Sequence, residues 1–154
     1  MSSLNQSQKD AAGLLTLGIH VSKAAATLPS STTQDIFTVA GGRVWVRLLV
    51  GQVTTLVGSG TTPDLQVQID PTTGTTVDIA TDVVIADDEV GTLYVVEGDG
   101  TALIPISSGY VPVTQGFVLS PGTVQIVTSE TTAGATKWDL WYVPLDEGAT
   151  VVSG

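Results

Sequence analysis

The stretch RVWVRLLVGQVTTLV, residues 43–57, decides the fold of this chain. Its first half alternates with the period of two that is typical of a half-buried β-strand. One face of that strand would carry Val44, Val46, Leu48 and Val50, and the other would carry Arg43, Trp45 and Arg47. Gly51 lies inside the pattern, where a glycine favours a bulge or a bend. The stretch therefore predicts one long β-strand with a single apolar face.

Shorter segments of the same character lie on both sides of this strand. The segment 136–143 has two faces, with Trp138, Leu140 and Tyr142 on one and Asp139 and Trp141 on the other. Further strands are expected at 18–28, 35–39, 64–70, 77–79, 83–85, 91–97, 102–106, 117–119 and 122–129. Asp99-Gly100 favours a tight hairpin, and residues 130–134 are typical of a second hairpin loop. Many short strands with such turns predict an all-β domain: a β-sandwich, a jelly-roll or an open barrel.

The chain has 154 residues, which fits one domain of ordinary size. No break in composition marks a second domain, so residues 18–154 are expected to form a single jelly-roll or β-sandwich. Residues 1–17 are polar and then mildly apolar without alternation, which is typical of an N-terminal arm or of a frayed terminus. No apolar run approaches the roughly 20 residues of a membrane helix, and the start lacks the basic residues of a signal peptide.

Five basic residues stand against fifteen acidic ones, which gives a formal net charge of −10. A nucleic-acid binder needs Lys and Arg to replace counterions on phosphate, and anionic membranes also attract basic surfaces. We therefore expect neither nucleic acid nor a membrane as a partner. The acidic balance suits a protein that stays soluble at high copy number. The absence of cysteine excludes disulfides, thiolate metal sites and thiol nucleophiles.

Residues that could carry chemistry are few. His20 is the only histidine, and no G-x-S-x-G motif accompanies it, so neither a catalytic triad nor a zinc site is indicated. The Gly-rich segment 57–61 lacks the helix that follows a phosphate-binding loop. Asp87-Asp88-Glu89 fits a solvated turn better than a calcium loop, with a bound cation left as the alternative. We therefore expect no enzyme, no catalytic residue, no cofactor and no metal.

Trp45, placed between Arg43 and Arg47, is the most informative position. In one interpretation its ring packs on a second sheet while the two guanidinium groups reach solvent. In the other, the three residues form a contact patch, because Trp and Arg are enriched at interface hot spots. Trp141 has the same two interpretations, and His20 fits an interface or surface position. The candidate interface residues are therefore Trp45, Arg43, Arg47, His20 and Trp141.

Two blocks of the sequence carry a family resemblance. They are TQDIFTVAGGRV, residues 33–44, and WDLWYVPLDEGA, residues 138–149. A Gly-Gly-Arg strand start and a final Trp-x-Leu-x-Tyr-x-Pro-Leu strand are similar to those of small virion proteins of tailed bacteriophages, in particular capsid decoration (cement) proteins. The resemblance covers the chain from about Leu17 onward, and its motifs are structural rather than catalytic.

The resemblance implies a jelly-roll or β-sandwich that binds the outer surface of the major capsid protein and stabilises the shell. It also implies a homotrimer at three-fold and local three-fold positions, made in the host cytoplasm and located on the virion exterior. A symmetric trimer contacts several capsomers at once, and three tethered weak contacts bind far more tightly than one.

Two other functions fit the sequence. One is a minor tail, head-fibre or adaptor component of a virion. The other is a carbohydrate-binding β-sandwich module, in which Trp45 or Trp141 would line a groove together with carboxamides such as Gln52 or Gln66. A hydrolase would require a carboxylate pair in a cleft, and no local motif supports one.

Overall fold

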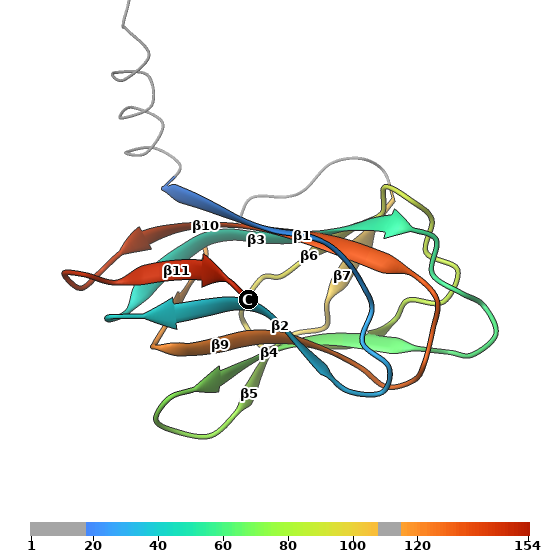
Figure 1. Ribbon diagram of the computed structural model, residues 1–154, viewed down its shortest axis with the longest axis horizontal. Coiled ribbons are helices and arrows are strands. Elements are labelled where there is room, and N and C mark those ends of the chain that lie inside the picture. The colour runs from blue at the N-terminus through green and yellow to red at the C-terminus, as the bar shows by residue number, and fades with distance from the viewer. Residues whose placement is uncertain (1–17, 108–114) are drawn as a thin grey trace, which may run out of the picture.

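Two antiparallel sheets packed face to face make up the protein in the computed structural model, which describes residues 18–107 and 115–154 (Figure 1). The predicted all-β fold and the β-sandwich alternative are confirmed. The predicted arm at 1–17 lies outside the described residues. In the described ranges, no helix long and apolar enough to span a membrane is found.

The upper sheet in Figure 1, sheet A, has six strands. Its order is β1 (Ile19–Thr27), β10 (Ala135–Pro144), β3 (Val44–Thr55), β6 (Leu93–Val95) and β7 (Ile104–Ile106), and β8 (Phe117–Leu119) also pairs with β3. The lower sheet, sheet B, has five strands. Its order is β11 (Thr150–Ser153), β2 (Thr33–Ala40), β9 (Gly122–Thr128), β4 (Asp64–Pro71) and β5 (Val77–Val84).

The core fills the space between the sheets with alternate side chains of each strand. The predicted inner face of β10 is confirmed, because Trp138, Leu140 and Tyr142 are all buried. The Trp138 ring lies against Gly51 of β3, where a Cβ atom would come within 2.8 Å of the ring. Gly51 therefore makes room for the largest buried side chain and does not mark a bend.

A bulge lies in the long strand at Arg47, four residues before Gly51. Trp141 pairs with Leu48 and Tyr142 pairs with Val46, so Arg47 is the extra residue of the bulge. Before the bulge the even-numbered residues of β3 face the core, and after it the odd-numbered residues do. The prediction that Leu48 and Val50 face the core is therefore wrong: Leu49 is fully buried, while both of these residues are half-buried on the outer face.

The connections also differ from the sequence prediction in three places. The segments 77–79 and 83–84 belong to one strand, β5, and Ile85 lies just beyond its end. β6 and β7 pair as predicted, but the connection between them is long and forms a bridge from Ala102 to Thr81 of sheet B. Residues 130–134 do not close a hairpin, because β9 lies in sheet B and β10 in sheet A. This loop joins the two layers of the sandwich.

Candidate interaction surface

The outer face of sheet A brings four of the five candidate interface residues together. His20 of β1 lies opposite Trp141 of β10, and Trp141 lies opposite Leu48 of β3. Two residues further along β10, Val143 lies opposite Trp45, whose other neighbour is Val118 of β8. Residues directly opposite each other point to the same face of a sheet. We call His20, Trp141, Trp45 and Arg47 the aromatic–basic patch.

His20 and Trp141 form one half of the patch. Their rings stack with centroids 4.4 Å apart and an interplanar angle of 18°. The His20 Nε2 atom lies 2.8 Å from Asp139 Oδ1, and the His20 side chain is 47% exposed. A polar contact this exposed contributes little to stability, so its main effect is to hold the imidazole against the indole.

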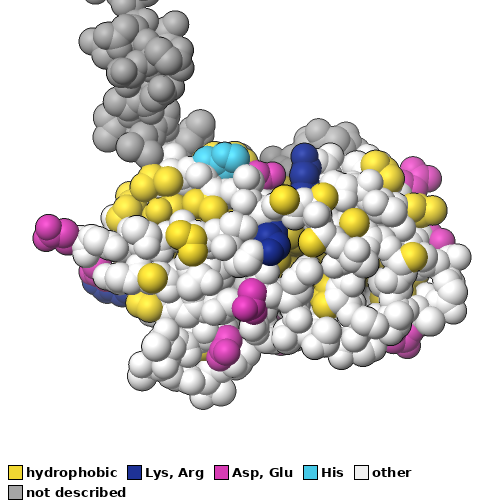
Figure 2. Space-filling view, viewed as in Figure 1, with side chains coloured by type: hydrophobic (Ala, Val, Ile, Leu, Met, Phe, Trp, Pro, Cys, Tyr) yellow, Lys and Arg dark blue, Asp and Glu magenta, His cyan; other side chains and the backbone are white. Residues whose placement is uncertain are grey.

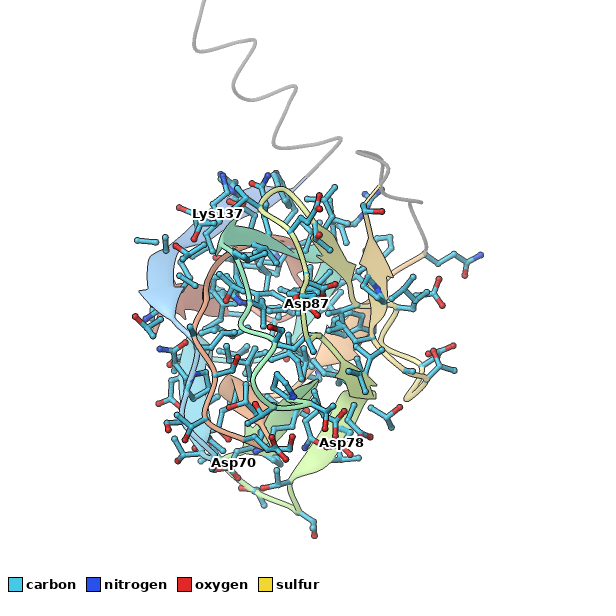
Figure 3. The ribbon with its side chains drawn as sticks, turned by 90° about the vertical axis from the view of Figure 1, so that its right-hand side faces the viewer. Asp70, Asp78, Asp87 and Lys137 are labelled. Atoms are coloured by element: carbon cyan, nitrogen blue, oxygen red, sulfur yellow. The ribbon has the colours of Figure 1, made fainter. Side chains whose placement is uncertain are left out.

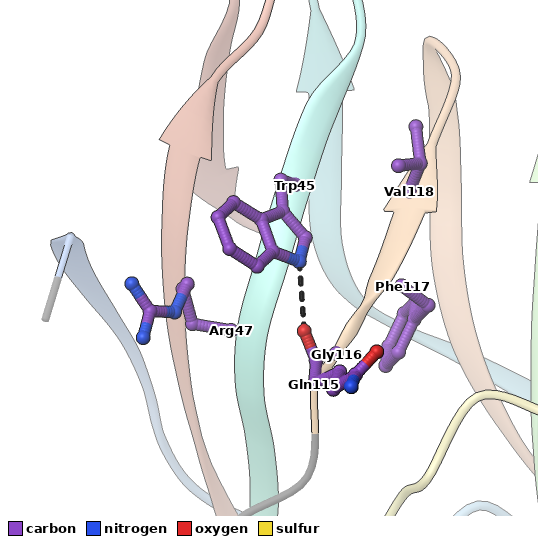
Figure 4. A pocket seen from close by; sticks show the side chains of 6 residues that line it. All are labelled: Trp45, Arg47, Gln115, Gly116, Phe117 and Val118. Atoms are coloured by element: carbon purple, nitrogen blue, oxygen red, sulfur yellow. Dashed lines mark hydrogen bonds between the residues drawn. The ribbon is translucent and has the colours of Figure 1, made fainter.

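Trp45 and Arg47 form the other half, beside an open hollow (Figure 4). The guanidinium carbon of Arg47 lies 4.8 Å from the Trp45 ring centroid, a cation–π contact. The Trp45 Nε1–H donates a 2.9 Å hydrogen bond to the Gln115 carbonyl oxygen, which fixes the indole. The hollow, about 560 Å³ in volume, is lined by Trp45, Arg47, Gln115, Gly116, Phe117 and Val118.

Gly116 brings the floor of this hollow close to β3. Its φ is +80°, and a Cβ atom there would lie 2.0 Å from the Val46 carbonyl oxygen. Only glycine allows both the left-handed conformation and the close approach. The next two residues, Phe117 and Val118, then reach the edge of the patch as part of β8.

Arg43, the fifth candidate, is held apart from the patch by Asp146. Its Nε and Nη2 atoms each donate a 2.9 Å hydrogen bond to that carboxylate, and its backbone N–H donates a third of 2.7 Å. The side-chain hydrogen bonds from Arg43 hold the pKa of Asp146 well below the usual aspartate range. Arg43 therefore fastens the turn after β10.

The outer face of sheet B carries Gln and Asp side chains where the outer face of sheet A carries aromatic and basic ones. A row of hydrogen bonds crosses it: Gln125 Nε2 donates to Asp35 at 2.7 Å, Gln68 Nε2 to Gln125 at 2.8 Å and Gln66 Nε2 to Asp78 at 3.1 Å. No strand of this sheet contains Lys or Arg. Figure 3 shows Asp70 and Asp78 on the lower side of the sandwich and Lys137 on the upper side. The two faces thus differ in charge and in aromatic content.

The acidic run Asp87-Asp88-Glu89 lies in the turn between β5 and β6. Asp88 points inward and accepts a 2.8 Å hydrogen bond from the buried Tyr94 hydroxyl. Burial raises the pKa of Asp88, and it raises that of the Tyr94 phenol far more. The residues that the structure describes contain no group of three acidic or histidine side chains placed to hold a metal ion.

Sequence reasoning missed the hollow and the contact between His20 and Asp139. Asp139 and Trp141 were predicted on one face of their strand, but nothing in the sequence shows that β1 pairs with β10 in this register. The hollow depends on β8, a strand of only three residues that pairs with β3 across about 70 positions of sequence.

The fold and the patch define a two-faced antiparallel β-sandwich with one aromatic–basic side. No family model matches the chain, and no curated protein matches it. Among solved structures, the chain is similar to one described as the structure of infectious bursal disease virus Gx strain, at 14% identity and a TM-score of 0.22. The alignment covers 86% of this chain and 33% of the viral chain, so this chain spans a third of that protein's length.

Proposed function

We propose that the protein is a capsid decoration (cement) protein of a tailed bacteriophage. It binds the outer surface of the major capsid lattice as a homotrimer, at three-fold and local three-fold positions, and stabilises the shell. It acts by binding and not by catalysis, and it needs no cofactor. The observation that carries the proposal is the aromatic–basic patch, which lies on one face only of an otherwise acidic sandwich.

The patch has the chemistry of a protein-binding surface. Interface hot spots are enriched in Trp and Arg, and both residue types meet here on adjacent strands. Each indole already has a fixed neighbour, His20 for Trp141 and Arg47 for Trp45. Rings held in place lose little conformational entropy on binding, which favours tight contact with a partner protein.

The opposite face suits the outside of a coated particle. The outer side of sheet B carries carboxylates of Asp35, Asp64, Asp70 and Asp78 among Gln and Thr side chains. Negative charge in many copies keeps particles apart in solution. We therefore orient the patch toward the shell and the acidic face toward solvent. The two sequence blocks similar to those of phage virion proteins support the same assignment.

The carbohydrate-binding alternative has less support from the geometry. Gln66 lies on the outer face of sheet B, on the other side of the sandwich from both Trp45 and Trp141. Gln52 does lie on the outer face of sheet A, but toward the end of β3 away from Trp45. Arg47 and His20 already cover one face of each indole, whereas a sugar ring stacks on an open aromatic face.

The copy number per purified particle tests the proposal. Quantitative mass spectrometry against the major shell protein should give hundreds of copies, in a fixed ratio to the shell subunits. A handful of copies would favour the tail, head-fibre or adaptor alternative instead. Absence from particles would overturn the virion assignment. Shells stripped of the protein should also lose their contents at a lower temperature than coated shells.

A further inference from the structure

The turn between β5 and β6 carries an exposed apolar side chain together with exposed acidic ones. Val90 is 64% exposed, more than any other large hydrophobic residue in the described part of the chain. Glu89 precedes it, Asp87 lies in the same turn, and Leu56, which is 53% exposed, directly follows the end of β3. We call these four residues the acidic knob. Figure 2 shows acidic and hydrophobic side chains side by side at this right-hand end, and Figure 3 shows Asp87 facing the viewer there.

The knob is rigidly built. Backbone hydrogen bonds join Gly91 to Val53 at 2.9 Å and Val57 to Asp88 at 3.1 Å, so the turn is tied to β3. The Asp88 side chain is anchored in the core by Tyr94. A preorganised loop loses little entropy on binding, so the exposed Val90 is presented in a fixed position.

The hollow beside Trp45 and Arg47 has complementary chemistry. It offers the apolar surfaces of Phe117 and Val118, the latter 55% exposed, next to a guanidinium group. The other basic residues in the described part of the chain are Lys23, Arg43 and Lys137, and none of them lines the hollow. In so acidic a chain, an apolar–acidic knob fits this apolar–basic hollow better than it fits the rest of the surface.

The hollow and the knob lie at opposite ends of β3, which has 12 residues. At about 3.3 Å per residue they are separated by roughly 30 Å, so they cannot meet within one chain. We propose that the acidic knob of one copy docks in the hollow of the next copy, and that this contact assembles the homotrimer. The proposal rests on the proposed function for the number of subunits and deepens it by naming the subunit contact.

A head-to-tail contact of this kind forms either a closed ring or an open filament. The hollow opens on the outer face of sheet A, whereas the knob projects from the end of the sandwich. Successive copies are therefore turned relative to one another, as a closed ring requires. In the ring, the half of the patch beside the hollow, Trp45 and Arg47, contacts the neighbouring copy, and the half that contacts the shell is His20 and Trp141.

The test is a charge swap followed by size-exclusion chromatography with light scattering on the full chain. Wild-type protein should have three times the 15.8 kDa mass of one chain. The single variants Arg47→Glu and Glu89→Arg should each weaken trimer formation about tenfold or more, because each places like charges in contact. The double variant Arg47→Glu/Glu89→Arg should recover the trimer.

Two variants with the same changes of charge serve as controls. Lys137→Glu on the patch face and Asp82→Arg on β5 should both remain trimeric. A wild-type monomer, single variants that remain trimeric, or a double variant that stays dissociated would each overturn the inference. If Arg47→Glu stays trimeric but no longer binds shells, the hollow contacts the shell instead. A trimer that binds no shell would overturn the proposed function and leave the subunit contact standing.

Discussion

Gly51 shows how one residue fixes the centre of the sandwich. A methyl group at this position would lie 2.8–2.9 Å from three atoms of the Trp138 ring. We expect Gly51→Ala to lower the free energy of unfolding by about 1–3 kcal/mol, because overpacking forces the ring or the strand to move. Denaturant unfolding measures the change. Gly60→Ala is the matched control, since a Cβ atom there meets nothing within 4 Å; equal stability of the two variants would contradict the packing argument.

The Arg43–Asp146 pair predicts a pH effect on stability. Hydrogen bonds from Arg43 lower the folded-state pKa of Asp146 below the value of about 3.9 for an unfolded aspartate. Between these two values the unfolded chain holds a proton that the folded chain does not, so stability falls as the pH falls below about 4. Asp146→Asn should therefore lose less stability than wild type between pH 4 and pH 2 in urea titrations. Identical slopes for the two proteins would rule out this contribution.

At the scale of the strands, the sequence allowed the elements to be predicted but not their partners. Alternation located the long strand at 43–57 and the two faces of β10, because a pleated strand repeats every two residues. It failed beyond Arg47, where a bulge inverts the alternation and moves Leu48 to the outer face. The pairing of β1 with β10 and of β8 with β3 depends on long-range packing, which no local pattern records. The residues of the patch could therefore be predicted from the sequence, but not the fact that they form one surface.

The edge strand β1 illustrates how the sheet avoids unwanted pairing. Lys23 lies opposite the buried Trp138, and the ladder shifts between Lys23 and Ala26. A charge placed inward on an edge and a bulge both discourage a second chain from adding a strand. We expect Lys23→Val to increase light scattering when the protein is concentrated. Lys137→Val, on the central strand β10, removes the same charge and should scatter less; equal scattering of the two variants would contradict the role of the edge.

At the scale of the whole molecule, the difference between the two faces yields the most direct prediction about binding. If the patch faces the shell, Trp141→Ala should weaken the binding of the protein to shells that lack it by about 30-fold or more. This is the effect of losing a hot-spot residue that contributes about 2 kcal/mol to binding. Val152→Ala is the matched control, because this exposed side chain lies on the acidic sheet and should be neutral. Binding isotherms with both variants, after circular dichroism has shown them folded, measure the difference. Equal affinities of the two variants would place the shell contact elsewhere. A larger loss of affinity with Val152→Ala would reverse the orientation, with the acidic face against the shell and the aromatic–basic patch toward solvent.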